Sequence, residues 1–261
     1  MLESLTPMAT PALNRSNLHR PRILCLHGGG TNARIFHSQC RVLRARLSAY
    51  FRLVFVDAPF YTAPGPDVVS VYAKWGPFRG WFPPGCVTES SGEIAAPISE
   101  SWATSEMVIG RIEKSIQDAM KADDHAGATG QWVAVLGFSQ GAKMAASLLY
   151  RQQTHSKDRF WLGQQVDYRF AVLLAGRAPM VSLSVDGLDE SGDLLHLPTI
   201  HVHGLKDPGL ALHRELYSSC QEESTRLIEW DGGHRVPIRT EDVMAVVDAI
   251  LAVAGKTGCF Q

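Results

Sequence analysis

The sequence WVAVLGFSQG, residues 132–141, passes from a run of apolar residues directly into a Gly-Phe-Ser-Gln-Gly segment. The apolar run 132–136 predicts a buried strand, and residues 140–151 have the spacing of a helix. A serine between such a strand and helix lies on a sharp turn, with its hydroxyl above the edge of the sheet. The glycines two residues to either side leave room for neighbouring chain segments. Ser139 is therefore the predicted nucleophile, and the alternative is a helix-capping serine in a glycine-rich turn.

Short apolar runs alternate with helical patterns along the rest of the chain, which favours βαβ units and a mostly parallel sheet flanked by helices. Further strands are predicted at 22–26, 52–56, 170–174, 199–202 and 226–229, and helices at 101–121 and 240–255, the last one capped by Thr240. Residues 121–130 (KADDHAGATG) are expected to break the first of these helices. We expect a flexible arm over 1–20, one α/β domain over 21–255 and a tail over 256–261.

Composition narrows the class of protein. The 261 residues carry 25 Lys+Arg and 26 Asp+Glu, a formal net charge of −1. A nucleic-acid partner is therefore not expected, and neither is a membrane partner, because no apolar run reaches the roughly 18 residues of a membrane span. The five cysteines are scattered without a Cys-x-x-Cys pair, so we expect no metal and a cytoplasmic protein. The N-terminal residues lack the apolar segment of a signal peptide.

A second glycine-rich segment, His27-Gly28-Gly29-Gly30, follows the predicted strand 22–26. Backbone N–H groups stabilise the negative charge that develops on a carbonyl oxygen during acyl transfer. We expect an oxyanion hole formed by the N–H of Gln140 and that of Gly29, with Gly30 as the next candidate. His27 is expected to order this loop. The alternative is a phosphate cradle, although the sequence lacks the Lys-Ser/Thr ending of one.

A serine nucleophile needs a base, and the base needs a carboxylate that orients it. Asp207 follows the predicted strand 199–202, and His234 follows the predicted strand 226–229, in the order expected after the serine. Among the competitors, His201 and His203 are expected to be core or supporting residues rather than metal ligands. Asp231 is expected to form part of a turn, and His213 is expected to lie on a solvated helix face.

A long insertion, about residues 59–100, is rich in aromatic residues and prolines and reads as a lid or pocket wall. The predicted substrate-binding residues are Phe60, Tyr61, Trp75, Trp81 and Phe82. The alternative is a satellite apolar cluster beneath a long loop.

The assembled motifs make the chain similar to the fungal serine hydrolase family of α/β-hydrolases. The matching segments are LCLHGGGTN (24–32), VDAP (56–59), GFSQG (137–141), HVHGLKDP (201–208) and DGGHRVP (231–237). The resemblance implies an α/β-hydrolase sheet, a triad of Ser139, Asp207 and His234, and no metal or organic cofactor. The family includes small carboxylesterases and thioesterases that release polyketides. Pro208-Gly209-Leu210 after the acid is less polar than in some relatives.

These inferences predict a serine hydrolase that cleaves an apolar ester or thioester through an acyl-enzyme. The favoured reaction is release of a polyketide or other acyl chain from a carrier, with the acyl carrier domain of a polyketide synthase as a possible partner. The alternatives are a generalist carboxylesterase and a non-catalytic ligand receptor on the same fold. A peptidase is not expected, since no separate substrate-gating domain is visible.

Overall fold

The computed structural model describes residues 17–83, 106–155, 166–183 and 193–260. Its centre is a six-stranded sheet of order β2-β1-β5-β6-β7-β8, in which every neighbouring pair is parallel. The strands are β1 (Arg22–Leu26), β2 (Arg52–Val56), β5 (Trp132–Phe138), β6 (Phe170–Leu174), β7 (Thr199–Gly204) and β8 (Thr225–Trp230). The predicted mostly parallel sheet is confirmed, and each predicted strand matches to within two residues.

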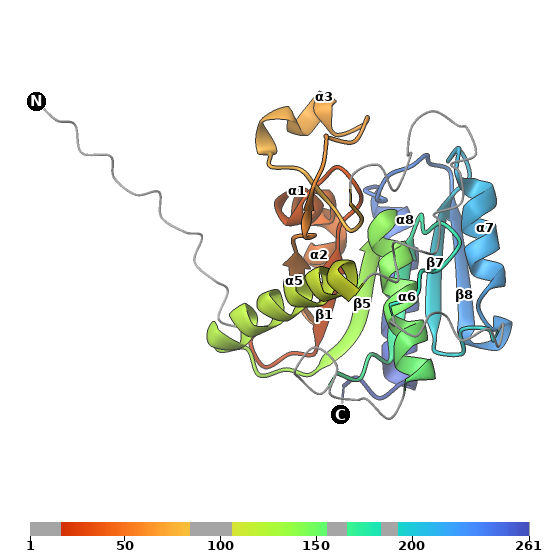
Figure 1. The fold of residues 1–261 in the computed structure, drawn as a ribbon. Coiled ribbons are helices and arrows are strands. Elements are labelled where there is room, and N and C mark those ends of the chain that lie inside the picture. Colours follow the sequence, from red (N-terminus) through yellow and green to blue (C-terminus); the bar gives the residue numbers. More distant parts are fainter. Residues whose placement is uncertain (1–16, 84–105, 156–165, 184–192, 261) are drawn as a thin grey trace, which may run out of the picture.

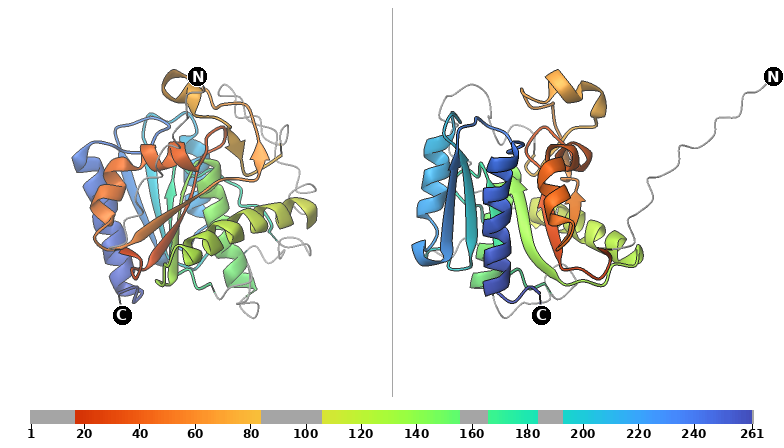
Figure 2. Two further views of the ribbon diagram at one scale, coloured as in Figure 1. Left: turned by 90° about the vertical axis from the view of Figure 1, so that its left-hand side faces the viewer. Right: turned by 180° about the vertical axis from the view of Figure 1, so that it is seen from behind.

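Helices cover both faces of this sheet (Figures 1 and 2). One layer contains α5 (Glu106–His125), α6 (Gln140–Thr154) and α7 (Leu210–Ser218), and the other contains α1 (Ala33–Gln39), α2 (Arg41–Leu47) and α8 (Thr240–Lys256). Strand side chains alternate between the two cores: Leu24 and Leu26 of β1 face the first layer, and Ile23 and Cys25 the second. Because both faces are buried, the central strands are continuous apolar runs.

Two predicted helix boundaries differ from the structure. The segment 121–130 does not end α5 at its start; the helix continues to His125. A second departure concerns α8, where Arg239 and not Thr240 occupies the N-cap position. The predicted start of the first helix, 101–105, lies outside the described residues, as do most of the arm 1–20 and the second half of the insertion. None of the helices in the described ranges has the length and apolar character needed to cross a membrane.

The first part of the insertion contains only short elements. They are β3 (Phe60–Tyr61), α3 (Val69–Tyr72), the 3₁₀ turn η2 (Ala73–Trp75) and β4 (Arg79–Gly80). β3 and β4 form a small antiparallel sheet, and the α3 part of the segment lies above α1 in the view of Figure 1. Prolines at 59, 64, 66 and 77 explain why no long regular element forms here.

A buried ion-pair network explains why α5 continues through its acidic end. Asp123 is buried and accepts hydrogen bonds from Arg52 Nε and Nη2, at 2.9 and 2.6 Å. Arg22, also buried, lies 3.4 Å from the same carboxylate and pairs with Asp124 as well. Arg22 and Arg52 begin the paired strands β1 and β2, so the last turn of α5 is joined to the start of the sheet.

Asp123→Ala is expected to lower the free energy of unfolding by about 3–5 kcal/mol, because it leaves two buried guanidinium groups without their shared carboxylate. The measurement is urea denaturation followed by circular dichroism. Asp118→Ala is the matched control on the same helix: its pair with Lys114 is exposed, and its loss is expected to cost less than about 1 kcal/mol. Equal effects of the two substitutions would contradict a structural role for the buried network.

Candidate active site

The turn between β5 and α6 holds Ser139 in a strained conformation. Ser139 has φ 54° and ψ −116°, a positive φ that L-residues rarely adopt. Its N–H donates to the Leu174 carbonyl at 2.9 Å, and its own carbonyl accepts the N–H groups of Ala142 and Lys143. A Cβ atom on Gly141 would lie 2.0 Å from the Leu26 carbonyl oxygen, so only glycine permits this approach to β1. The predicted strand–turn–helix context of the serine is present.

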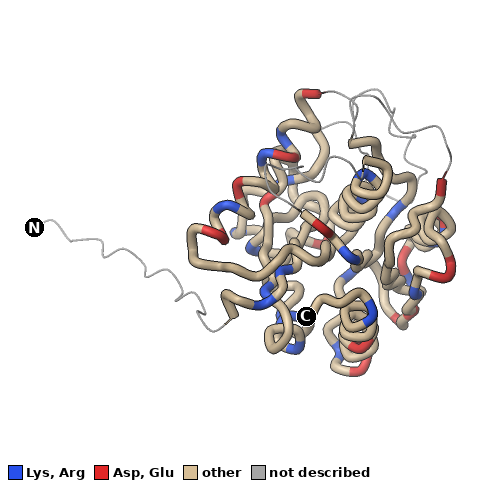
Figure 3. Tube along the Cα trace, turned by 90° about the horizontal axis from the view of Figure 1, so that it is seen from below, with Lys and Arg blue, Asp and Glu red and all other residues tan. Residues whose placement is uncertain are grey.

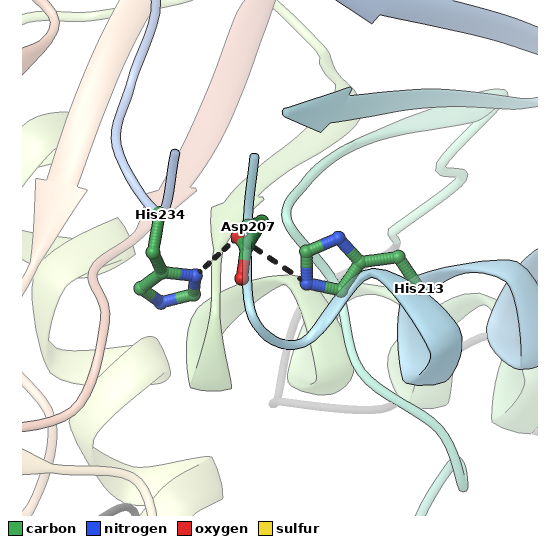
Figure 4. A group of neighbouring side chains, drawn as sticks. All are labelled: Asp207, His213 and His234. Atoms are coloured by element: carbon green, nitrogen blue, oxygen red, sulfur yellow. Dashed lines mark hydrogen bonds and ion pairs between the residues drawn. The ribbon is translucent and has the colours of Figure 1, made fainter. Parts of the chain in front are cut away.

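The three residues predicted as a triad lie together. His234 Nε2 is 3.0 Å from Ser139 Oγ, and His234 Nδ1 is 2.7 Å from Asp207 Oδ2. Asp207 and His234 follow β7 and β8, so all three side chains come from the carboxyl edge of the parallel sheet, where such sites gather. Figure 4 shows Asp207 between the rings of His234 and a second histidine, His213.

Asp207 is held as a carboxylate despite its burial. Burial raises its pKa, but the hydrogen bond and charge of His234 and the Gly209 N–H, 2.8 Å from Oδ1, more than offset this, and the net shift is downward. The carboxylate is therefore ionised at neutral pH. It accepts the Nδ1 proton of His234, which leaves Nε2 free to accept a proton from the serine hydroxyl.

The glycine loop after β1, residues 28–30, lies beside Ser139, and only part of it lines the cleft. Gly28 and Gly29 line the same cleft as Ser139, and Gly29 is the more exposed of the two. Gly30 is buried against the 64–65 segment, with its carbonyl accepting the Gly65 N–H at 3.0 Å. The N–H of Gln140 belongs to the first turn of α6, where N–H groups have no partner within the helix. Gly29 lines the cleft and Gly30 does not, so Gly29 with Gln140 stays the predicted pair of oxyanion donors.

His27 and Trp81 secure that loop. His27 Nε2 accepts the Ala58 N–H at 3.0 Å, so the ring proton is on Nδ1, which lies 2.7 Å from the Gly28 carbonyl. Burial lowers the pKa of His27 to about 4, which keeps the ring neutral. Trp81 Nε1 donates to the His27 carbonyl at 2.8 Å. The expectation that His27 orders the loop agrees with these contacts.

With this geometry in place, comparison with known proteins identifies the family. The family model described as Serine hydrolase (FSH1) matches residues 16–246. The chain belongs to this serine hydrolase family. A probable esterase of Aspergillus terreus is 51% identical over 246 residues, covering 90% of each chain, and the Monascus ruber esterase pigG is 48% identical over 272 residues, covering 94% of this chain and 96% of pigG. The resemblance inferred from the five motifs is confirmed.

Solved structures bear on the fold of this serine hydrolase. The Arabidopsis thaliana SOBER1 structure has a TM-score of 0.54 and 17% identity, covering 90% of this chain and 99% of SOBER1. The Bacillus cereus carboxylesterase has a TM-score of 0.52 and 16% identity, covering 90% of this chain and 89% of the other. These likenesses concern the fold alone, and they confirm the predicted α/β-hydrolase architecture.

His213 is not on a solvated face, and that expectation is wrong. The side chain is fully buried, on the side of α7 that also buries Leu216. His213 Nε2 lies 3.6 Å from Asp207 Oδ2, beyond hydrogen-bond length. A nine-residue helix with one strongly apolar buried residue gives too weak a pattern to reveal which face is covered.

His203 and His201 continue inward from His213 as a row of buried rings. Ring centroids are 5.4 Å apart for His213 and His203, and 5.8 Å apart for His203 and His201. Burial is the main cause that lowers the pKa of His213 and His203 to about 4 and that of His201 to about 3. The prediction of core or supporting histidines agrees with this burial.

Asp207, His213 and His234 place their ligand-type atoms within 4.8 Å of one another, as a metal site would. However, the 2.7 Å contact between Asp207 and His234 is a hydrogen-bond distance. Ligand atoms about 2.0–2.2 Å from a tetrahedral zinc would be held farther apart, at roughly 3.3 Å. The arrangement fits proton sharing better than metal ligation.

Asp231, as expected of a turn residue, is exposed and pairs with Lys206 at 2.6 Å.

The five aromatic residues predicted to bind substrate lie outside the described lining of the cleft at Ser139, although the Trp81 N–H donates to Oε1 of the neighbouring Gln140 at 3.2 Å. Phe60, Trp81 and Phe82 are buried in the core on the α5–α6 side, and Tyr61 is 62% exposed. Trp75 packs beneath Arg34, whose guanidinium carbon lies 4.2 Å from the ring centroid. None of the five lines the cleft that contains Ser139 among the described residues. The alternative of an apolar cluster beneath a loop describes three of them better.

The cleft itself has a volume of about 660 Å³, within the range of pockets for small molecules. Its walls include Ser139, His234, the glycine loop, segment 65–72 and the residues that follow His234. Segment 65–72 belongs to the insertion predicted as a lid or pocket wall, but none of its residues is among the predicted substrate-binding residues.

Because several of its histidines are buried, the protein is expected to become less stable to unfolding in mild acid. Their pKa is lowered in the folded state, so the unfolded chain takes up protons below its ordinary histidine value of about 6.5 while the folded chain does not. Stability is therefore expected to fall as pH decreases from 7.5 to 5.5, by up to about 1.4 kcal/mol per pH unit for each of His27, His201, His203 and His213. Asp207 does not contribute here, because its lowered pKa places its loss of stabilisation at lower pH.

Urea denaturation at pH 7.5, 6.5 and 5.5 measures this dependence. His201→Gln, which is neutral at every pH used, is expected to reduce the slope by one histidine's share. A free energy of unfolding that is constant over the range would show that the buried rings do not resist protonation.

Proposed function

We propose that this serine hydrolase cleaves carboxylic esters and thioesters through an acyl-enzyme on Ser139, with His234 as base and Asp207 as its orienting acid. The observation that carries the proposal is the continuous contact from Ser139 Oγ through the His234 ring to the Asp207 carboxylate, at 3.0 and 2.7 Å. Relatives at about half identity over nearly the whole chain are named esterases, which supports an ester-like substrate.

The reaction has two halves. His234 Nε2 takes the proton of Ser139 as Oγ attacks the acyl carbon, and the oxyanion is stabilised by the N–H groups of Gly29 and Gln140. His234 then gives this proton to the departing alcohol or thiol, which leaves an acyl-serine ester. In the second half, water loses a proton to His234 and attacks the ester, and Ser139 Oγ recovers a proton as the free acid departs.

Within this chemistry we favour a thioesterase that releases a polyketide or another acyl chain from a carrier, such as the acyl carrier domain of a synthase. A cleft of about 660 Å³ accommodates a bulky acyl group, and the motif resemblance includes release enzymes. A cytoplasmic location is part of the proposal, in keeping with free, buried cysteines at positions 25, 40, 220 and 259. A generalist carboxylesterase is the second candidate, favoured by the names of the relatives.

Ser139→Ala is expected to lower kcat by about 10⁶, because no other group supplies the nucleophile. Asp207→Asn is expected to lower it by about 10⁴, since the amide stabilises the wrong tautomer of His234. Asp231→Asn is the matched control, because this nearby carboxylate faces Lys206 in solvent and should leave kcat within twofold. Burst kinetics with a nitrophenyl ester measure all three variants. Near-normal activity in Ser139→Ala would refute the assigned nucleophile.

Rates on matched oxygen esters and thioesters of increasing acyl length distinguish the two candidates. A thioesterase that releases long chains should show a kcat/KM that increases with acyl length and is at least tenfold higher for thioesters. Equal rates on short oxygen esters would favour the carboxylesterase. Ligand binding without turnover would instead indicate a receptor.

A further inference from the structure

The cleft around Ser139 is lined by more basic than acidic side chains. Four basic residues, Arg41, Arg177, Lys206 and Arg235, contribute to its walls, against one acidic residue, Asp67. The excess is local, because the whole chain carries a net charge of −1 and its basic and acidic residues are interspersed along the described trace (Figure 3). A cleft lined by one sign of charge concentrates ligands of the opposite sign.

Three of the four basic residues have no carboxylate partner among the described residues. Lys206 pairs with Asp231 at 2.6 Å, whereas no ion pair joins Arg41, Arg177 or Arg235 to an acidic residue in the part of the chain that the structure describes. By contrast, Arg22, Arg52, Arg151 and Arg214 each pair with a carboxylate. The guanidinium groups of Arg41, Arg177 and Arg235 are therefore available to a ligand.

Arg177 packs against the loop that follows Asp207. It follows β6 and is half-buried, while Arg41 and Arg235 are exposed at the rim. A Cβ atom on Gly209 would lie 2.7 Å from Arg177 Nε, so the guanidinium packs directly against the loop after Asp207. Arg177 Nε is buried and has no hydrogen-bond partner in the described structure. Its charge also helps to lower the pKa of His213.

The position of Arg177 has a chemical consequence. A guanidinium offers a planar set of donors that matches a carboxylate or a phosphate. Asp207 is already engaged by His234 and the Gly209 N–H, and no ion pair links it to Arg177. The guanidinium of Arg177 thus lies beside the loop after Asp207 but does not pair with the Asp207 carboxylate.

We propose that the cleft selects substrates that carry an anionic group, a carboxylate or a phosphate, bound by Arg177 with Arg41 and Arg235 attracting it at the rim. This inference rests on the proposed ester or thioester hydrolysis and specifies its substrate class. The anion has two possible sources: a carboxylate on the acyl group, or a phosphate on the pantetheine arm of a thiol leaving group. Both are recognised by the same chemistry.

Two matched substrate pairs separate these sources. The acyl-side pair is 4-nitrophenyl butyrate and the mono-4-nitrophenyl ester of succinic acid, which differ by a terminal carboxylate. The thiol-side pair is S-butyryl-pantetheine and S-butyryl-4′-phosphopantetheine, which differ by a phosphate. The readout is the ratio of kcat/KM for the anionic member to that for the neutral member, so a general loss of activity cancels.

Arg177→Gln is expected to lower this ratio about tenfold for the favoured pair, and Arg177→Lys, which keeps the charge but loses the fork, less than that. If the Arg177 variants do not fold, Arg235→Gln at the exposed rim tests the proposal instead, and it too should lower the ratio. Arg226→Gln is the matched control: it removes the same charge from β8, outside the cleft lining, and should leave the ratio unchanged. Raising the salt concentration from about 0.05 to 1 M should also reduce the wild-type ratio.

The outcomes are distinct. A ratio above one that falls in Arg177→Gln for the succinyl pair places the anion on the acyl group, and the same result for the phosphopantetheine pair places it on the carrier arm. Hydrolysis of all four substrates with ratios near one, or equal effects of Arg177→Gln and Arg226→Gln, would overturn this inference and leave the proposed function standing. Hydrolysis of none would overturn the proposed function, and the inference with it.

Discussion

The site depends on the close approach of three backbone segments at the end of β5. Backbone hydrogen bonds on both sides support the positive φ of Ser139: its N–H donates to β6, and its carbonyl accepts N–H groups of the first turn of α6. Gly141 lets that turn come within contact of the Leu26 carbonyl of β1. Ser139, the proposed nucleophile, is thus positioned by backbone contacts to two neighbouring strands and a helix, so the sheet fixes its direction.

The parallel sheet supplies the partners of the serine. Parallel strands bring their carboxyl ends to one edge, so residues 68 and 95 positions apart from Ser139 in sequence, Asp207 and His234, meet it there. A buried carboxylate is costly unless its oxygens are hydrogen-bonded, and Asp207 satisfies this with the imidazole of His234 and the Gly209 N–H. The same bonds suit Asp207 to its proposed role of orienting His234.

Charge is divided between the interior and the cleft. Behind the acid, the three rings of His213, His203 and His201 are buried and neutral, so they add packing without a competing positive charge. In front of it, Arg177 and the rim arginines give the cleft a positive character. Asp207 therefore has hydrogen bonds to His234 and the Gly209 N–H but no ion pair with Arg177, and the basic side chains lie on the cleft side, as the proposed anionic substrate requires.

Sequence alone determined the parts that depend on local pattern: the buried strands, the turn at Ser139, and Asp207 and His234 just after two strand ends. These carry strong signals because apolar runs and glycine spacing reflect backbone constraints. Tertiary structure alone decided what each remaining side chain faces. Phe60, Trp81 and Phe82 pack in the core, and His213 is buried. Within the insertion predicted as a lid or pocket wall, it is residues 65–72, and not the predicted aromatic residues, that line the cleft together with the arginines. The physical reason is that burial and pairing arise between segments distant in sequence, so composition shows that aromatic or charged groups exist but not what they contact.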